Sequence, residues 1–237
     1  MDIGIELIVS SAKKFGIELD ETAQARLIRY AELLVEWNEK MNLTAITEPK
    51  EIGIKHFLDS LLIFKNSQIP QNAKVIDVGT GAGFPGLVMK IARPDIKLTL
   101  LDGLNKRLIF LQEVLNELGL EAELIHSRAE EGGRRKELRE KFDIATARAV
   151  ARLNVLSEYC LPFVKKGGSF IALKGPTLGE ELADSKSAIK TLGGGNVMLY
   201  RENLENEGER VICDIKKISQ TPTTFPRITQ KIQKKPL

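Results

Sequence analysis

A glycine-rich segment near the middle of the chain offers the clearest chemistry. Residues 75–86 read VIDVGTGAGFPG, so an apolar run ending at Val78 leads directly into Gly79, Gly81 and Gly83. Glycine lets a backbone approach a ligand closely, and a glycine-rich turn after a strand binds nucleotides in open α/β sheets. The segment therefore predicts a nucleotide site but leaves the nucleotide open.

Two carboxylates bear on the choice of ligand. Residues 81–86 match the dinucleotide pattern GxGxxG, and Asp102 lies near the distance at which a ribose-binding acid is expected, so NAD has to be considered. Asp77, however, lies two residues before Gly79, where it would repel a pyrophosphate and favour the ammonium and sulfonium of S-adenosylmethionine. No tyrosine is followed four residues later by lysine, as a short-chain dehydrogenase would require. The pattern favours the methyl donor over NAD.

Further polar residues follow the next predicted strands. Asp102 ends the apolar run 98–101 and should stand at the same rim as the glycine loop, where it can accept both ribose hydroxyls or begin the next helix. The following strand ends at His126, and we expect Ala129 and Glu130 to flank an adenine there. Glu130 is also compatible with a solvated charge at a helix start.

The elements that must position these residues alternate along the middle of the chain. Strands are predicted at 74–78, 97–101, 122–126, 142–146 and 168–173, and helices at 86–93, 105–118, 152–161 and 180–192. Repeated βα units imply a mostly parallel sheet with helices on both faces, an α/β fold of the Rossmann-like type. After a flexible turn at 193–195, strands at 196–200 and 210–217 predict an antiparallel hairpin that closes the sheet.

The first part of the chain is predicted to be helical. Asp20 can cap a helix whose apolar residues recur every three or four positions up to Met41, and a second helix is expected at 49–64. Residues 68–72 resemble a linker. We therefore expect a helical extension over 1–72 packed on the core, an α/β domain over 73–220 and a basic tail over 221–237.

The composition is that of an ordinary globular protein of 237 residues, with 43% hydrophobic residues and a formal charge of +3. No long apolar run or export signal is visible, so we expect a cytoplasmic protein without membrane contact. Cys160 and Cys213 stand far apart, which predicts neither a metal site nor a disulfide. Residues 215–237 hold six basic residues and no acidic one, a solubilising tail or a contact for a polyanion.

Taken with others, these residues resemble the ribosomal RNA small subunit methyltransferase G family, also called glucose-inhibited division protein B. The resemblance covers almost the whole chain in six ordered motifs. They are WNEKMNLTAI at 37–46, HFLDSL at 56–61, DVGTGAGFPG at 77–86, LDGLNKR at 101–107, SRAE at 127–130 and ARA at 147–149.

The resemblance implies a class I S-adenosylmethionine-dependent methyltransferase that methylates N7 of a specific guanine in 16S ribosomal RNA and leaves S-adenosyl-L-homocysteine. It also implies 16S ribosomal RNA or a precursor of the small ribosomal subunit as partner, with a monomer as the expected state. The implied donor contacts are Gly79, Phe84, Asp102, Ala129, Glu130 and Arg148.

The chain departs from the family pattern in two places. Gly103, beside Asp102, replaces the usual serine, which would soften the ribose-side turn of the donor site. The tail keeps Pro226-Arg227 and the final Lys-Pro-Leu but lacks the Gly-x-Pro usually found between them. This departure puts the implied RNA contacts of the tail in doubt.

Guanine N7 bears a lone pair and no proton, so direct in-line attack on the methyl group needs no general base. Arg148 follows the strand predicted at 142–146 and is the catalytic candidate, since its guanidinium could pair with the donor carboxylate or donate to guanine O6. The alternative for Arg148 is a surface salt bridge with a nearby glutamate.

The target should be an unpaired guanine, because the major groove of A-form RNA is too narrow to enter. The candidate phosphate contacts, besides the tail lysines, are Lys40, Lys55, His56, Arg128, Arg134, Arg135 and Arg152. Competing interpretations are an NAD-binding oxidoreductase, a non-catalytic RNA-binding assembly factor and a small-molecule methyltransferase.

Overall fold

The computed structural model describes residues 1–148, 151–204 and 207–237. Within them lies a seven-stranded sheet in the order β3-β2-β1-β4-β5-β7-β6. The strands are β1 Lys74–Val78, β2 Lys97–Asp102, β3 Glu123–His126, β4 Phe142–Arg148, β5 Val164–Lys174, β6 Gly194–Leu204 and β7 Gly208–Lys217. Strands β1 to β5 are parallel, whereas β7 is antiparallel to β5 and to β6. The predicted parallel sheet with a closing hairpin is confirmed.

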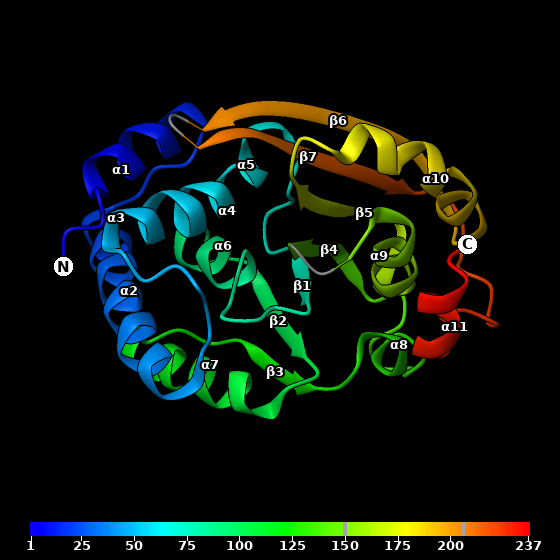
Figure 1. Ribbon diagram of the computed structural model, residues 1–237, viewed down its shortest axis with the longest axis horizontal. Helices are drawn as coiled ribbons and strands as arrows, with labels where there is room; N and C mark the ends of the chain where they lie inside the picture. The colour runs from blue at the N-terminus through cyan, green and yellow to red at the C-terminus, as the bar shows by residue number, and fades with distance from the viewer. Residues whose placement is uncertain (149–150, 205–206) are drawn as a thin grey trace.

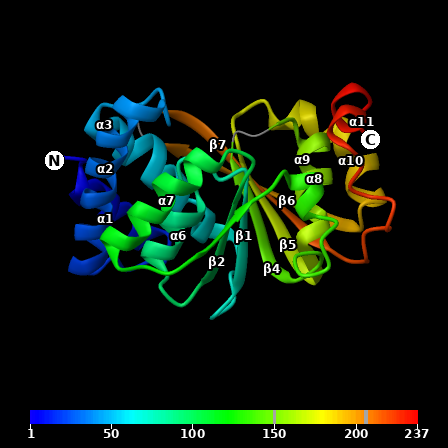
Figure 2. The same cartoon turned by 90° about the horizontal axis from the view of Figure 1, so that it is seen from below.

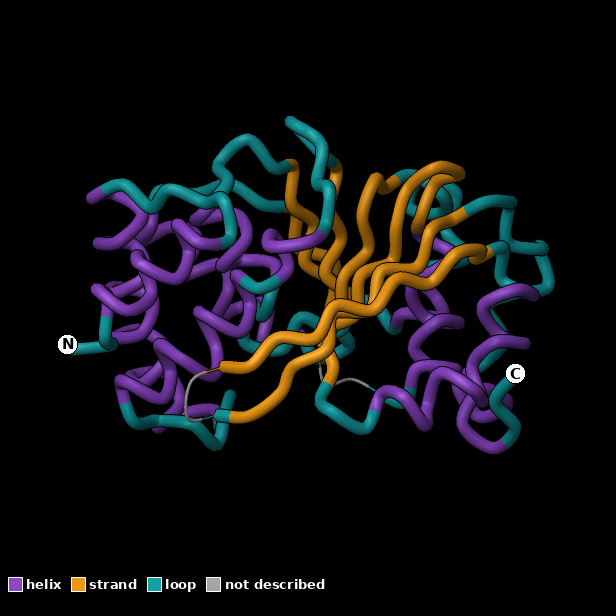
Figure 3. Tube along the Cα trace, turned by 90° about the horizontal axis from the view of Figure 1, so that it is seen from above, coloured by secondary structure: helices purple, strands orange, loops and turns teal. Residues whose placement is uncertain are grey.

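Helices cover both faces of this twisted sheet (Figures 1, 2 and 3). One group is α1 Ile5–Lys14, α2 Glu21–Met41, α3 Pro49–Glu51, α4 Asp59–Leu61, α5 Ile63–Asn66, α6 Gly86–Ala92 and α7 Asn105–Leu118. The other is α8 Ala129–Gly132, α9 Leu153–Cys160, α10 Leu178–Thr191 and α11 Thr229–Lys234. Each group buries its own apolar cluster against the sheet. None of the helices in the described ranges combines the length and apolarity needed to cross a bilayer.

The rim formed by the carboxyl ends of the parallel strands is where a ligand is expected. Neighbours β1 and β2 are consecutive in sequence, but on the other side β1 pairs with β4, so the strand order reverses at β1. Ligands of open α/β sheets bind in the crevice outside such a reversal. Val78, Asp102 and Arg148 end β1, β2 and β4 and therefore lie at this rim, as their positions in the sequence predicted.

The N-terminal helices share one apolar core with the sheet and do not form a core of their own. Leu27 and Leu34 of α2 belong to the same buried cluster as Leu87 of α6 and Leu111 of α7. The predicted cap of α2 is confirmed, because Asp20 Oδ1 accepts the amide of Ala23 at 2.7 Å. The extension therefore packs on α6 and α7.

The second predicted helix is present but irregular. Residues 52–58 form a π-helical segment between α3 and α4. Such wider turns are rare and occur often at functional sites. This segment carries His56, whose side chain is buried, and it brings Asp59 at its end into contact with β4.

The C-terminal segment folds back onto the core. Ile232 of α11 is fully buried against the cluster that includes α9. Lys217 is 1% exposed, and its Nζ donates to the carbonyl of Leu161 at 2.6 Å and to Thr221 Oγ1 at 2.7 Å. Arg227 forms an ion pair with Glu158 at 2.7 Å. The interpretation of this region as a solvated basic tail is therefore wrong for Lys217 and Arg227.

Candidate active site

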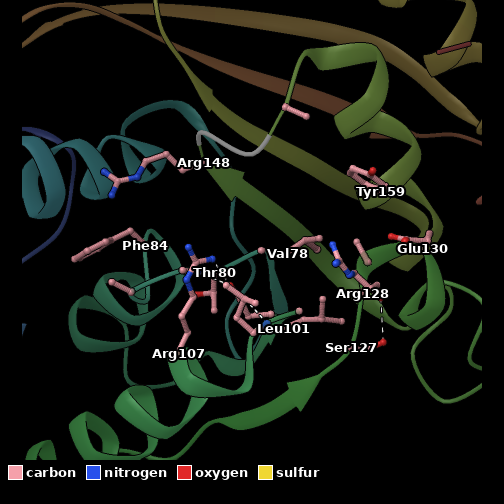
Figure 4. Close-up of a pocket in the computed structure, with 18 of the residues that line it drawn as sticks. Val78, Thr80, Phe84, Leu101, Arg107, Ser127, Arg128, Glu130, Arg148 and Tyr159 are labelled. Atoms are coloured by element: carbon pink, nitrogen blue, oxygen red, sulfur yellow. Dashed lines mark hydrogen bonds and ion pairs between the residues drawn. The ribbon is translucent and has the colours of Figure 1, made fainter. Parts of the chain in front are cut away.

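A cavity of about 720 Å³ opens at the carboxyl rim of the sheet. Figure 4 shows Phe84 and Arg148 at one side of it, Glu130 and Tyr159 at the other, and Thr80 between them. The first group, with Thr44 and His56, is called the aromatic end. The second group, with Ala129, Thr229 and Gln233, is called the Glu130 end.

The glycine loop forms the floor of the cavity. Gly79, Gly81 and Gly83 all have φ in the left-handed region, at 70°, 62° and 103°. A Cβ on Gly81 would meet no heavy atom within 4 Å, so its backbone angle is what requires glycine. A Cβ on Gly83 would collide with the hydroxyl of Tyr30. Gly79 and Gly81 line the cavity, whereas Gly83 packs behind it.

Tyr30 supports the loop from the N-terminal extension. Its side chain is fully buried, its hydroxyl donates to the carbonyl of Ala82, and its ring stacks on Phe84 with centroids 5.5 Å apart. The sequence alone assigned no role to Tyr30, which belongs to the apolar pattern of the helix that ends at Met41. The signal in the sequence was its hydroxyl, because a buried tyrosine hydroxyl needs a hydrogen-bond partner, which here is the glycine loop.

Asp77 lies beneath the loop and outside the cavity lining. Its Oδ2 accepts the hydroxyl of Thr80 at 2.7 Å and the amide of Gly86 at 3.0 Å, which holds both ends of the loop. Its Oδ1 is buried and has no partner among the described residues. Burial raises the pKa of Asp77 to about 6 despite these hydrogen bonds. At neutral pH the carboxylate is thus ionised, poorly solvated and favourable to a nearby cation.

Asp102 lies at the predicted rim, and it is 2% exposed. Its Oδ2 accepts the amide of Gly81 at 2.9 Å and lies 3.3 Å from Arg107 Nη1, and its Oδ1 accepts the amide of Leu104 at 2.8 Å. Because α7 begins after Leu104, Asp102 is not the N-cap of that helix. A carboxylate oxygen can accept more than one hydrogen bond, so Oδ1 retains capacity for a hydroxyl.

Gly103 and Glu130 both line the cavity. Gly103 does not have a left-handed φ, and a Cβ on it would lie 3.4 Å from Cδ of Arg128, an ordinary contact, so nothing in the backbone demands glycine there. Glu130 is 9% exposed and accepts the hydroxyl of Thr229. The interpretation of Glu130 as a solvated charge is wrong, because α11 covers it. Ala129 lines the cavity beside it.

Arg148 reaches from β4 across to the π-helical segment. Its Nη1 donates to the carbonyl of Lys55 at 2.9 Å and to Asp59 Oδ2 at 2.8 Å, and its Nη2 lies 3.0 Å from His56 Nδ1. The guanidinium carbon is 4.9 Å from the ring centre of Phe84. The ion pair with Asp59 is largely buried, so the expected alternative of a surface salt bridge with glutamate is wrong.

His56 packs against both Arg148 and Phe84 and is largely buried. Its ring stacks on that of Phe84 with the ring centroids 4.4 Å apart, and its Nε2 lies 3.0 Å from Thr44 Oγ1. Burial, with the charge of Arg148, lowers the pKa of His56 to about 3. A buried neutral imidazole cannot contact a phosphate as a cation, which makes the prediction for His56 wrong.

Most of the other residues predicted to contact phosphates already interact with groups of the protein. Lys40, Lys55, Arg135 and Arg152 form ion pairs with acidic residues, and Arg134 donates to the carbonyl of Thr224. Arg128 is exposed and lines the cavity. Lys106, which the sequence analysis did not select individually, is exposed in the first turn of α7 nearby.

Comparison with known proteins extends these findings. A family model described as rRNA small subunit methyltransferase G matches residues 23–210. The chain is 53% identical over 236 residues to the ribosomal RNA small subunit methyltransferase G of Clostridium perfringens (strain 13) and 50% identical over 234 residues to that of Alkaliphilus oremlandii, with 98% of each chain covered. A solved S-adenosylmethionine-dependent O-methyltransferase from Thermotoga maritima is similar in fold, with a TM-score of 0.50 and 16% identity over 79% of this chain and 72% of that one.

The site fits the methyl donor of such enzymes. The unpartnered Asp77 oxygen would repel a pyrophosphate but favours a cationic amino acid, and the glycine cradle leaves room for a ligand against Gly81. With the family relationship, this makes S-adenosylmethionine the cofactor. Since the family model spans most of the chain and relatives share half of its residues over nearly its full length, the chain belongs to the ribosomal RNA small subunit methyltransferase G family.

Proposed function

We propose that the protein transfers a methyl group from S-adenosylmethionine to N7 of one guanine in 16S ribosomal RNA. The observation that carries this proposal is the shape of the cavity, which runs from the Glu130 end over the glycine loop to the aromatic end. One end offers groups suited to a nucleoside, and at the other end the Arg148 guanidinium lies over the ring of Phe84 and borders space for a base. The family relationship supports the same reaction.

The donor would be held by residues at the loop and at the Glu130 end. Gly79 and Gly81 present backbone to it, Asp102 would accept its ribose hydroxyls, and Ala129 with Glu130 would border its adenine. Asp77 contributes negative potential from beneath the loop, and Gly103 lies beside Asp102 in the lining. When bound, the donor supplies an electrophilic methyl group on a sulfonium.

The chain has to orient the guanine and does not have to deprotonate it. N7 carries a lone pair and no proton, and the basic Nδ1 of His56 is already occupied by Arg148. Phe84 and Arg148 would confine the base, and a fixed approach of about 3–3.5 Å can lower the barrier by as much as ~7–11 kcal/mol. Arg148 donates three hydrogen bonds to the protein, so two of its five N–H groups remain for the substrate.

The RNA partner would reach this end as an unpaired or flipped nucleotide. Lys106 and Arg128 lie exposed near the mouth of the cavity and would contact phosphates. The substrate is 16S ribosomal RNA, free or within a precursor of the small subunit.

The experiment is incubation of the protein with methyl-labelled donor and either purified 16S ribosomal RNA or small subunits, followed by digestion to nucleosides. The label is expected in 7-methylguanosine. Label in another nucleoside, or RNA binding without transfer, would refute the proposed chemistry, the latter favouring a non-catalytic assembly factor. The Asp102→Ala variant is expected to bind the donor more weakly by calorimetry, and an unchanged dissociation constant would remove Asp102 from ribose binding.

A further inference from the structure

Thr44 is held rigidly in the loop between α2 and α3. Its amide donates to Asn38 Oδ1 at 2.8 Å, and its Oγ1 accepts the amide of Ile46 at 3.0 Å. The side chain lines the cavity at the aromatic end, together with His56 and Phe84. Its hydroxyl oxygen therefore has a fixed position on a residue that borders the space proposed for the base.

Arg148 determines which nitrogen of His56 carries the proton. A guanidinium has only donors, so His56 Nδ1, 3.0 Å from Arg148 Nη2, must be the acceptor. A neutral imidazole carries one proton, which is then on Nε2. The lowered pKa of His56 is consistent with the neutral form. Since Nε2 lies 3.0 Å from Thr44 Oγ1, His56 donates its proton to that oxygen.

The hydroxyl of Thr44 is consequently a donor with no acceptor in the described part of the chain. A threonine hydroxyl has two lone pairs and one hydrogen. The amide of Ile46 and Nε2 of His56 occupy the two lone pairs. The remaining hydrogen has no acceptor within residues 1–148, 151–204 and 207–237, and the side chain lines the cavity. The site thus presents one oriented donor to a ligand.

We propose that Thr44 donates a hydrogen bond to O6 of the target guanine and is a specificity-determining residue of the reaction. This inference rests on the proposed function. Guanine presents O6 as an acceptor next to N7, whereas adenine has a donor amino group at that position. A hydroxyl locked as a donor accepts guanine and opposes adenine. His56 and Arg148 act on this contact as positioning residues, because their hydrogen bonds fix the direction of the hydroxyl.

The first test compares Thr44→Val, which keeps the side-chain shape but removes the hydroxyl, with Thr44→Ser, which keeps the hydroxyl. We expect Thr44→Val to lower kcat/KM for methylation of ribosomal RNA by roughly tenfold to a hundredfold. Thr44→Ser should restore most of it, and the dissociation constant for S-adenosylmethionine should not change. The matched control is Thr47→Val, in the same loop but exposed and outside the lining.

The second test changes the base, at the guanine that nucleoside mapping identifies. Hypoxanthine keeps O6 and N7, whereas 2-aminopurine keeps N7 and lacks O6. On hypoxanthine, Thr44→Val should lose the same factor in kcat/KM, relative to wild type, as it does on guanine. On 2-aminopurine, wild type and Thr44→Val should be equally slow, because the contact is already absent.

Three results would overturn the proposal. They are unchanged kcat/KM in Thr44→Val, an equal loss of donor affinity in that variant, and the same fold-loss on 2-aminopurine as on guanine. The last result would show that Thr44 only shapes the loop. Failure of the proposed function is distinguishable, because the wild-type protein would then transfer no methyl group to guanine in ribosomal RNA.

Discussion

At the scale of single residues, the ionised form of Asp77 lowers the stability of the fold but favours the binding of a cationic ligand. Its pKa is raised from an ordinary 3.8 to about 6, chiefly by burial, so the folded protein holds this proton more tightly than the unfolded chain. The carboxyl group therefore contributes stability that is fully present below pH 3.8 and lost as the pH rises through 6. At neutral pH the ionised group costs free energy of folding, while its charge favours a cationic donor.

Replacing Asp77 by asparagine should separate these effects. Asp77→Asn keeps a group that can accept from Thr80 and Gly86 but removes the buried charge. We expect the ligand-free variant to gain up to about 3 kcal/mol in free energy of unfolding at pH 7, with a much smaller gain at pH 4, as measured by chemical denaturation. A variant less stable than wild type at pH 7 would contradict this account of Asp77.

Loss of the charge on Asp77 should raise the stability of the protein but lower its affinity for the donor. In the wild-type protein, affinity for S-adenosylmethionine should fall as the pH drops below about 6, because Asp77 becomes neutral. The Asp77→Asn variant should bind more weakly at pH 7 and show a flatter dependence between pH 7 and pH 5. Calorimetric titration at these pH values measures both, and parallel profiles for the two proteins would exclude Asp77 from donor binding.

At the scale of elements, α11 completes the cavity although it comes from the last residues of the chain. Glu158 of α9 has 1% of its side chain exposed and accepts from the backbone amide and the guanidinium of Arg227. This pair fixes the start of α11, which places Thr229 and Gln233 in the cavity lining. A segment that appeared to be a basic tail is thus the wall of the Glu130 end.

The Arg227→Ala variant tests this coupling. It leaves the Glu158 carboxylate buried without its cation, which should lower the free energy of unfolding by roughly 3–5 kcal/mol. With α11 loosened, the dissociation constant for the donor should rise. Lys234→Ala, an exposed position on the same helix, is the control and should change neither quantity. Reduced stability with wild-type donor affinity would show that α11 is not part of the donor site.

At the scale of the whole molecule, the positions of the exposed basic residues say more about RNA binding than the formal charge of +3 does. Several basic residues are engaged in ion pairs, whereas Arg128 is exposed and lines the cavity, and Lys106 is exposed in the first turn of α7, where its Nζ lies 3.3 Å from the carbonyl of Met41. Lys141 is also exposed but precedes β4, at the opposite edge of the sheet. The two edges therefore provide a comparison within one molecule.

Binding of 16S ribosomal RNA should weaken steeply as salt is raised, because phosphate contacts release counterions. Lys106→Ala and Arg128→Ala should each reduce the slope of log affinity against log salt by about 1. Lys141→Ala should leave the slope unchanged. Fluorescence anisotropy at several salt concentrations measures these slopes, and an equal effect of Lys141→Ala would argue against a binding face at the rim.

Local pattern was enough to predict the elements and the type of ligand. The helix predicted at 105–118 and the strand at 74–78 have the same bounds in the structure, because apolar periodicity and capping act within a few residues. The turn predicted at 193–195 is confirmed only at Gly193, whose φ is 87°, since β6 begins at Gly194, where a Cβ would lie 2.6 Å from Ile189 of α10. Close packing of the strand against the helix that precedes it, and not flexibility, explains Gly194.

The sequence by itself determined the alternating α/β order, the glycine loop and the position of Asp77, which favours a methyl donor over a dinucleotide, because each depends on neighbours in the chain. Only the tertiary structure decided that Asp77 acts from below the loop, that Arg148 joins His56 and Asp59 across about ninety residues of chain, and that α11 covers Glu130. These contacts join segments that are far apart in the sequence, so the periodicity of a helix or strand cannot predict them. Burial then fixes the protonation and direction of each group, which is why the chemistry of the aromatic end emerges only in the folded protein.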